Sequence, residues 1–276
     1  MHKKWIAVIA SVVLIAAIVI PVAAITYGEL DDGEHPYVGL IGVYDEDWEW
    51  MWRCSGTLLS DTVVLTAGHC TAYDPEYGTP KYAKVWFDEQ IFYDPILDDY
   101  TNPDFYTGET KPHPLYVGLT IPETHDIGVV ILDEPVDGIT VYGQLPTAGF
   151  LDEMAQKSNK RQTYLTSVGY GVNDVKPEVI SLRTRYKAMS FLISLNNALT
   201  DGWNIKSSNN PGQWTDDAVT GGTCSGDSGG PVFYGGYESN LVVGITSFGN
   251  SNCTGTDYSY RVDIEDSLDF LSQYVE

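Results

Sequence analysis

The sequence predicts an all-β fold. Short runs rich in valine, isoleucine and tyrosine recur along most of the chain, and 27 glycines and 14 prolines punctuate them. Runs of this kind between turn-forming residues are typical of strands in sandwiches and barrels. The 276 residues suffice for one large domain or two small ones with a sizeable core.

The expected strands are short and lie on both halves of the chain. In order they cover Tyr37–Val43, Val63–Thr66, Lys84–Phe87, Ile127–Leu132, Tyr164–Val168, Pro231–Tyr234 and Leu241–Ser247. Gly235 and Gly236 separate the last two runs and predict a hairpin connection, because glycine adopts the dihedral angles that tight turns need.

The C-terminal end has a helical pattern instead. Leu268, Leu271 and Val275 fall on one face of a helix. We expect a helix from Asp266 to Val275, with Asp266 or Ser267 as its N-cap, because their side-chain oxygens accept the first free amide N–H groups.

The N-terminal 24 residues predict a secretory signal peptide. A basic start at residues 2–4 precedes an apolar run from Trp5 to Ile20, and Pro21 leads to a small-residue cleavage site at 22–24. A retained membrane anchor is the alternative, but the run is short for a membrane span. We expect residues 25–276 to be secreted as a monomer with no stable membrane association.

The charge balance is strongly acidic, with 15 Lys and Arg against 38 Asp and Glu and a net charge of −23. This disfavours nucleic-acid binding, which needs a basic face. A solvated surface explains the acidity, while adaptation to salt or acid and a preference for cationic substrates stay open.

Residues 88–114 are acidic and rich in tyrosine and proline, which predicts a long loop over the first half of the fold. Asp94, Asp98, Asp99 and Asp104 are candidate calcium ligands, but their spacing fits no defined motif and a solvated loop is favoured. His113 lies between two prolines and is expected on the surface of this loop.

One serine lies in a glycine-rich turn, Gly226-Asp227-Ser228-Gly229-Gly230-Pro231. A serine hydroxyl becomes a nucleophile when a base removes its proton and fixed donors hold the oxyanion. Two further motifs supply candidate partners. The run Val63–Cys70 ends in Ala67-Gly68-His69-Cys70, and Asp126 opens the apolar run after His125. His125 is a weaker candidate base because it lacks the Ala-Gly-His-Cys context.

The chain order is therefore His69, Asp126, Ser228, which resembles the chymotrypsin order and differs from those of subtilisins and α/β-hydrolases. Nearly the whole chain after residue 24 resembles the secreted trypsin-like serine endopeptidases of the chymotrypsin fold. The resemblance implies two antiparallel six-stranded β-barrels and a C-terminal helix, with a first barrel at about 25–145, a second at about 146–276, and the active site between them.

The resemblance also implies the catalytic roles. Ser228 is the expected nucleophile, His69 the general base and acid, and Asp126 the residue that orients the imidazole. The backbone N–H groups of Gly226 and Ser228 are expected to form the oxyanion hole. Protein or peptide substrates are implied, and no cofactor or metal has a role in this chemistry.

A second implied feature is an activating ion pair. In the family, the acid before the serine binds a newly freed N-terminal amine, and here that acid is Asp227. Cleavage after Ala24 leaves Ile25-Thr26-Tyr27-Gly28, which is similar to the family's Ile-Val-Gly-Gly start, although Thr26 and Tyr27 depart from it. The hypothesis is that signal peptidase itself creates the activating terminus.

The side-chain preference before the scissile bond stays open. The resemblance implies a pocket lined by Gly222, Thr223, Ser247, Gly249 and Asp257. Gly222 stands where trypsins have aspartate, which favours large apolar side chains, whereas Asp257 on the opposite wall is a substitute carboxylate that favours basic ones.

Four cysteines in an exported chain indicate two disulfides, and three pairings are possible. The resemblance implies Cys54–Cys70 and Cys224–Cys253, each bracing one catalytic loop.

Three other functions compete with a secreted endopeptidase. A catalytically silent binding module is disfavoured because all three triad residues are present. A membrane-anchored protease would leave Ile25 without a free amine. A serine esterase shares the chemistry but has a different chain order.

Overall fold

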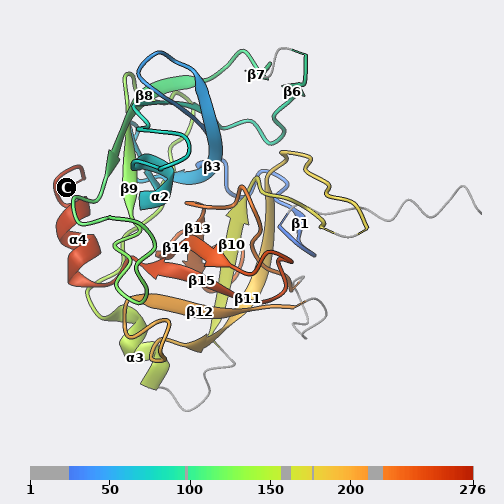
Figure 1. The fold of residues 1–276 in the computed structure, drawn as a ribbon. Helices are drawn as coiled ribbons and strands as arrows, with labels where there is room; N and C mark the ends of the chain where they lie inside the picture. The colour runs from blue at the N-terminus through green and yellow to red at the C-terminus, as the bar shows by residue number, and fades with distance from the viewer. Residues whose placement is uncertain (1–24, 97–98, 157–162, 176, 211–219, 276) are drawn as a thin grey trace, which may run out of the picture.

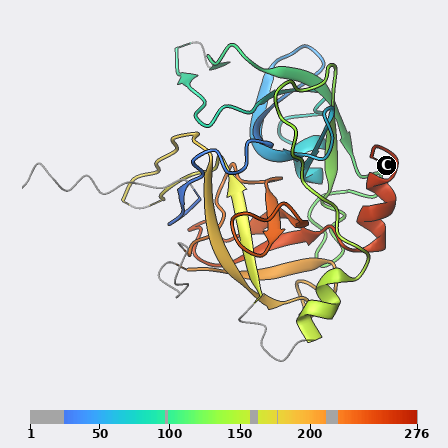
Figure 2. The ribbon, with the colours of Figure 1, turned by 180° about the vertical axis from the view of Figure 1, so that it is seen from behind.

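The computed structural model describes residues 25–96, 99–156, 163–175, 177–210 and 220–275. The expected signal peptide, Asp98 and the C-terminal residue lie outside these ranges. The chain forms two β-barrels stacked one above the other (Figures 1 and 2). None of the described helices is long and apolar enough to cross a membrane.

The first barrel is closed by six antiparallel strands in the order β2-β3-β4-β9-β8-β5. Their bounds are β2 Val38–Tyr44, β3 Trp50–Leu58, β4 Val63–Thr66, β5 Tyr82–Trp86, β8 Tyr106–Pro112 and β9 Gly128–Leu132. A two-stranded ribbon, β6 (Tyr93–Asp94) and β7 (Asp99–Tyr100), projects from it.

The second barrel has the order β11-β10-β13-β14-β15-β12, and the pairing of β11 with β12 closes it. Its strands are β10 Tyr164–Gly169, β11 Tyr186–Ser194, β12 Asn204–Asn209, β13 Pro231–Tyr234, β14 Val242–Gly249 and β15 Gly255–Arg261. The prediction of two six-stranded antiparallel barrels is therefore confirmed. A short helix, α3 (Phe150–Gln156), lies between the barrels in sequence.

The two ends of the described chain cross to the opposite barrel. The N-terminal strand β1 (Glu29–Leu30) pairs with β11 of the second barrel. The C-terminal helix α4 (Glu265–Leu271) packs on the first barrel, where Phe270 contacts His113 edge-on at 5.0 Å. Figure 1 shows β1 beside β11 and α4 on the side of β9. The boundary between the barrels near residue 146 stays a prediction. The two ends of the described chain do not respect this boundary, because each packs on the other barrel.

The C-terminal helix is confirmed, but its limits differ from those expected. It begins at Glu265, and Ile264 is its N-cap, with no side-chain capping bond. Asp266 does not cap because its carboxylate instead accepts bonds from Tyr260 and His125. The Ser267 hydroxyl donates to the Arg261 carbonyl instead.

The prediction of a loop throughout residues 88–114 is wrong at its end. Residues 106–112 form β8, which pairs with both β5 and β9 and closes the first barrel. Its sequence, YTGETKP, is too polar to suggest a barrel strand. The side chains of β8 contribute little apolar burial. The strand is stabilised instead by its backbone hydrogen bonds to β5 and β9 and by the apolar residues of those strands.

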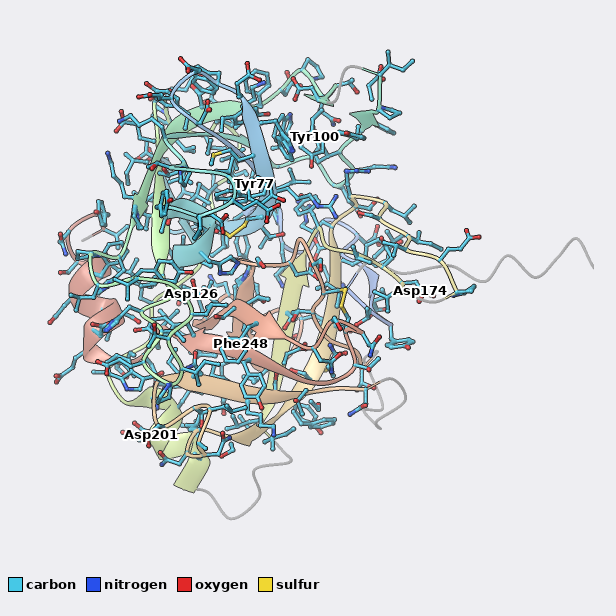
Figure 3. All side chains as sticks on the ribbon, viewed as in Figure 1. Tyr77, Tyr100, Asp126, Asp174, Asp201 and Phe248 are labelled. Carbon is cyan, nitrogen blue, oxygen red and sulfur yellow. A yellow bond between two sulfur atoms is a disulfide. The ribbon has the colours of Figure 1, made fainter. Side chains whose placement is uncertain are left out.

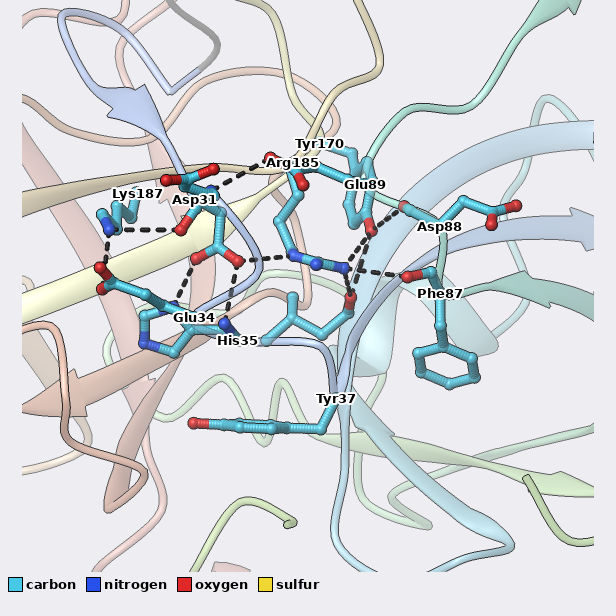
Figure 4. A network of polar contacts seen from close by, with 12 residues as sticks. Asp31, Glu34, His35, Tyr37, Phe87, Asp88, Glu89, Tyr170, Arg185 and Lys187 are labelled. Carbon is cyan, nitrogen blue, oxygen red and sulfur yellow. Dashed lines mark hydrogen bonds and ion pairs between the residues drawn. The ribbon is translucent and has the colours of Figure 1, made fainter. Parts of the chain in front are cut away.

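A buried polar network joins the N-terminal segment to both barrels (Figure 4). Asp31 accepts hydrogen bonds from the Arg185 Nε–H at 2.9 Å and from the amide N–H of His35, also at 2.9 Å. Arg185 donates onward to the carbonyl groups of Val38 and Phe87 in the first barrel. The network thus fixes one barrel against the other on the N-terminal side.

Candidate active site

The β4–β9 pairing brings the histidine motif to the aspartate motif. Thr66 at the end of β4 is the partner of Gly128 at the start of β9. In an antiparallel pair, the residues that follow one strand lie beside those that precede the other. His69, on the one-turn helix α2 (Gly68–Thr71) after β4, therefore meets Asp126, two residues before β9.

The imidazole of His69 is held by the Asp126 carboxylate. His69 Nδ1 lies 3.0 Å from Oδ2 and 3.1 Å from Oδ1, and the His69 amide N–H donates to Oδ1 at 2.8 Å. Asp126 is fully buried, whereas the His69 side chain is 25% exposed. Asp126 lies where the two barrels meet (Figure 3). Because Nδ1 is engaged, Nε2 is the nitrogen left for another group.

The second barrel contributes a further donor to this carboxylate. The Ser247 hydroxyl on β14 donates to Asp126 Oδ2. Ser247 was expected to line the substrate pocket, and its contact with Asp126 was not anticipated from the sequence. The bond ties the His69–Asp126 pair to the barrel that carries Ser228.

The charges of His69 and Asp126 stabilise one another. Burial lowers the pKa of His69, but the charge of Asp126 and the hydrogen bond to it outweigh this and raise that pKa above its ordinary value. Burial alone would raise the pKa of Asp126, yet His69 and the bonds from His69 and Ser247 hold it below its ordinary value. The pair therefore favours an imidazolium beside a carboxylate, the state that a general base reaches after taking a proton.

Ser228 lies in a turn that both barrels hold in place. The Ser55 amide N–H on β3 donates to the Ser228 carbonyl at 2.8 Å, and the Ser55 hydroxyl donates to the Gly226 carbonyl at 2.9 Å. On the other side, the Gly229 amide N–H donates to the Thr246 carbonyl at 2.9 Å. These bonds set the serine at the barrel interface, and Ser228 and His69 line the same cleft of about 910 Å³.

Gly226 is required by the shape of this turn. Its φ is +96°, and an added Cβ would lie 2.8 Å from Arg53 Nε. A side chain at this position would therefore strain the backbone and displace the Arg53 guanidinium. Among the hydrogen bonds between described residues, the N–H groups of Gly226 and Ser228 have no acceptor, so both remain free to bind one.

Asp227 is completely buried behind this turn. Its carboxylate accepts the amide N–H groups of Gly171 at 2.8 Å and Cys224 at 2.9 Å. No described lysine or arginine forms an ion pair with it, and burial raises its pKa to about 7. This carboxylate is thus enclosed and hydrogen-bonded without an ion pair, and the charge of Arg53 offsets only part of the effect of burial on its pKa.

The predicted activating residue lies in the same region of the second barrel. Ile25 is 0% exposed and packs with Tyr186 and Ala188. The next residue, Thr26, pairs with Gly222, whose amide N–H donates to the Thr26 carbonyl at 3.1 Å. In the intact chain the Ile25 nitrogen is part of a peptide bond, so it carries no charge.

The predicted pocket residues gather around a buried polar cluster. An added Cβ on Gly222 would lie 2.2 Å from Asn209 Cγ, so the Asn209 side chain fills the space that Gly222 leaves. Asn209 Nδ2 donates to Asp257 Oδ1 at 2.8 Å, and the Thr223 amide N–H donates to Asp257 Oδ2 at 2.6 Å. Nothing in the sequence suggested a role for Asn209.

Asp257 faces the strand that was expected to form the pocket wall. Its Oδ1 lies 3.3 Å from the position of an added Cβ on Gly249, and it is 3% exposed. Burial raises its pKa to about 6, and no described cation pairs with it. Beside it, Phe248 stacks on Tyr258 at 4.7 Å.

Two disulfides brace the loops of this site. Cys54 is joined to Cys70, directly after His69, and Cys224 is joined to Cys253. These are the pairs that the family resemblance implies. The first links β3 to α2 and the second links the serine turn to the segment before β15.

The histidines outside the motif have other surroundings. His113 was expected on the surface, but it is only 6% exposed and stacks parallel to His125 at 5.1 Å. His125 Nδ1 lies 3.0 Å from Asp266 Oδ2 on α4. The packing of α4 on the first barrel buries both rings, which the local sequence did not indicate. His125 is thus directed at the C-terminal helix.

The candidate calcium ligands have separate partners. Asp99 is bonded to Tyr44 and Lys84, and Asp94 accepts the amide N–H of Ile96. The described residues contain two other groups with metal-ligating atoms near one another. In one of them the cysteines form the Cys54–Cys70 disulfide, and the other is the His113, His125 and Asp266 cluster.

A family model described as Trypsin matches residues 28–270. The chain belongs to the trypsin family. It is thus a member of a family of serine-type endopeptidases, as its motifs predicted.

Several characterised proteases are similar to this trypsin-family chain. The phenoloxidase-activating enzyme of Bombyx mori is 29% identical over 234 residues, covering 75% of this chain and 50% of that protein. Kallikrein-2 of Homo sapiens is 27% identical, covering 80% of this chain and 77% of the relative. Brachyurin of Leptuca pugilator is 28% identical, covering 72% and 76%. The chain therefore spans about half the length of the first relative and about three quarters of the other two.

A solved structure described as HL collagenase has the same fold. The superposition has a TM-score of 0.62 and covers 91% of this chain and 97% of the other, at 17% sequence identity. At this identity the likeness concerns the fold.

Proposed function

We propose that this trypsin-family chain is a secreted endopeptidase that cleaves proteins or peptides through Ser228, His69 and Asp126. The observation that carries the proposal is the meeting of three distant motifs at one cleft. His69 and Ser228 line the cleft, and the buried Asp126 holds the imidazole of His69 from behind. Acyl transfer by a serine needs this set of residues.

The chemistry follows from this arrangement. His69 Nε2 takes the proton of Ser228 as its oxygen attacks the scissile carbonyl, and the Asp126 carboxylate stabilises the imidazolium that results. The free N–H groups of Gly226 and Ser228 bind the oxyanion. His69 then protonates the leaving amine, and water hydrolyses the acyl-enzyme by the same steps in reverse.

The activating ion pair is part of the proposal. Asp227 is buried without an ion-pair partner among the described residues, and Ile25 is buried near the Thr26–Gly222 pairing. Cleavage after Ala24 would give Ile25 a charged amine, for which Asp227 is the carboxylate. The Thr26 hydroxyl, which lies 3.2 Å from the Gly222 carbonyl and 3.3 Å from Asn209 Oδ1, connects that segment to the pocket.

We further propose a preference for a basic residue before the scissile bond. Asp257 is a buried carboxylate beside Gly249 with no described cation, so a substrate lysine or arginine would neutralise it. A substrate cation also suits a chain with a net charge of −23.

The intact mass of the secreted protein tests the main proposal, measured before and after a serine-reactive phosphonate. We expect a mass that begins at Ile25 and the addition of one inhibitor, and we expect Ser228→Ala to abolish the addition. Labelling that persists in Ser228→Ala would place the nucleophile elsewhere. An active, labelled protein that begins at another residue would support the proposed endopeptidase activity but contradict activation by cleavage before Ile25.

A further inference from the structure

One guanidinium lies in the cleft that contains His69 and Ser228. Arg53, on β3, is half-buried and lines this cleft directly before Cys54. Its side chain packs against the serine turn, because an added Cβ on Gly226 would lie 2.8 Å from Arg53 Nε and 3.1 Å from Nη2. The guanidinium thus borders the residue whose N–H is assigned to the oxyanion.

Most of the donors of Arg53 are not used by the protein. Its Nη2–H donates to the Ser181 hydroxyl at 2.7 Å. Within the described part of the chain, no carboxylate lies within ion-pair distance of Arg53, and the charge of Arg53 acts at longer range on the buried Asp227. A guanidinium has five N–H donors in a planar fork that matches a carboxylate. Arg53 is therefore positioned by one neutral bond and keeps its charge and further donors for a ligand.

The remaining walls of the cleft are mainly aromatic and aliphatic. The aromatic residues are Trp52, Tyr73, Tyr77 and Tyr116, and the aliphatic ones are Ala72, Pro75, Val117 and Leu119. Asp74 is the carboxylate among the described lining residues. Asp74 Oδ1 already accepts the amide N–H groups of Glu76 and Tyr77. Low-polarity walls around a fixed cation strengthen its attraction for an anion that enters the cleft.

The location of Arg53 indicates which part of a substrate it meets. The pocket residues Gly222, Gly249 and Asp257 belong to the second barrel and do not line this cleft. Arg53 comes from the first barrel, directly before the Cys54–Cys70 disulfide, and lines the cleft with His69 and Ser228. With the residue before the scissile bond in the pocket, the leaving segment passes over His69, which protonates it, and continues toward Arg53.

We propose that Arg53 binds a substrate carboxylate on the C-terminal side of the scissile bond, so that the enzyme favours glutamate or aspartate one or two residues after the cleaved bond. This inference rests on the proposed endopeptidase function. It assigns opposite charges to the two sides of the bond, with Asp257 selecting a cation before it and Arg53 selecting an anion after it.

Matched peptides test this assignment. Quenched fluorescent peptides that differ only by glutamate or glutamine at the first or second position after the bond are compared by kcat/KM. Hydrogen bonds to charged groups, discounted for partial exposure, predict a preference for glutamate of about fivefold to thirtyfold. Arg53→Gln should bring the ratio close to one, and Arg53→Glu should reverse it.

Lys84→Gln is the control, since it removes one cation from β5 outside the cleft, where Lys84 lies 3.4 Å from Asp99. It should keep the wild-type ratio. Phosphonate labelling of each variant reports whether its active site is formed. The ratio of kcat/KM between the glutamate and glutamine peptides is measured first on the wild type, so this part of the test needs no variant to fold. Equal cleavage of both peptides by the wild type overturns the role of Arg53 alone. Absence of cleavage and of labelling removes the proposed function, and this inference with it.

Discussion

Buried carboxylates occur in two contrasting settings in this protein. Asp31 lies in the network between the barrels, whereas Asp227 and Asp257 lie behind the serine turn and the substrate pocket. All three are at most 3% exposed. They differ in whether a cation of the protein itself neutralises them.

Asp31 is fully neutralised. His35 Nδ1 lies 2.5 Å from Oδ1, and Arg185 Nε lies 2.9 Å from Oδ2 (Figure 4). Burial alone would raise the pKa of Asp31, but His35 and Arg185 lower it to about 2. Its carboxylate is therefore saturated by partners that the fold supplies, and it serves to hold the barrels together.

Asp227 and Asp257 have amide donors but form no ion pair with a described cation, and burial raises their pKa values to about 7 and about 6. The charge of Arg53 offsets only part of this rise at Asp227. Burying a charge without a partner is costly, so such groups persist where a partner arrives later. The comparison teaches that the two buried carboxylates without an ion-pair partner are those with a proposed ligand. For Asp227 that ligand is the amine of Ile25 after cleavage, and for Asp257 it is a substrate cation.

The largest effect is expected at Asp126, whose partner His69 is the proposed catalytic base. Asp126→Asn should lower kcat for a peptide substrate by about 10⁴, because an amide neither orients the right imidazole tautomer nor stabilises its cation. Asp133→Asn, at the exposed far end of β9, is the matched control and should keep the wild-type kcat. A loss of tenfold or less in Asp126→Asn would remove this residue from the triad.

A large loss of stability is expected at the neutralised site. Asp31→Asn leaves Arg185 buried without a carboxylate, which should lower the free energy of unfolding by about 3–5 kcal/mol at pH 7, measured with urea. The pKa of Asp31 in the folded state lies below its unfolded value of 3.8, so its stabilisation is present above pH 4. It is lost as the pH falls toward about 2.

The variant should lose this acid dependence, while Asp32→Asn, an exposed neighbour, should behave as the wild type. Equal unfolding free energies for Asp31→Asn and the wild type at pH 7 would show that the network does not stabilise the fold.

Asp227→Asn tests the proposed ion pair between Asp227 and the amine of Ile25. If Ile25 supplies that amine, the variant should lose about 10²–10³ in kcat/KM, because an uncompensated ammonium remains buried. An alanine inserted before Ile25 should cause a similar loss by displacing the amine. Near-wild-type activity in both variants would separate Asp227 from activation.

The smallest effect concerns Asp257 and the pocket. Asp257→Asn should lower the preference for lysine over methionine before the scissile bond by about tenfold to a hundredfold, as expected for a charged hydrogen bond. Because its folded pKa is about 6, the wild-type preference should decline as the pH falls through that value, and the variant should lack this dependence. A wild-type enzyme that prefers methionine would favour the apolar alternative for this pocket.

The pH dependence of the free energy of unfolding also distinguishes Asp257 from Asp31. A carboxyl whose folded pKa is raised stabilises the fold at low pH and loses this contribution as the pH rises through the folded pKa. Asp257→Asn should therefore reduce the loss of unfolding free energy between pH 4 and pH 8, opposite in direction to the effect of Asp31→Asn.

Local sequence alone determined the all-β class, the runs that became β2, β4, β5, β9, β10, β13 and β14, and the three motifs of the candidate site. These features depend on residue types that are close together in the chain: β-branched runs between turns, and glycines around one serine. The family resemblance added the barrel architecture, since motif order is a property of the whole chain.

Only the tertiary structure decided the rest. The polar strands β8 and β12 gain their stability from partners distant in sequence, so their own patterns do not reveal them. The positions of Arg53 beside Gly226 and of Asn209 beneath Gly222 arise where separate segments meet. Whether a carboxylate is neutralised depends on cations that are remote in the chain, as Arg185 is from Asp31. The sequence therefore predicted the candidate catalytic groups, while the packing of the two barrels decided which charged side chains have no ion-pair partner among the described residues and can bind a ligand.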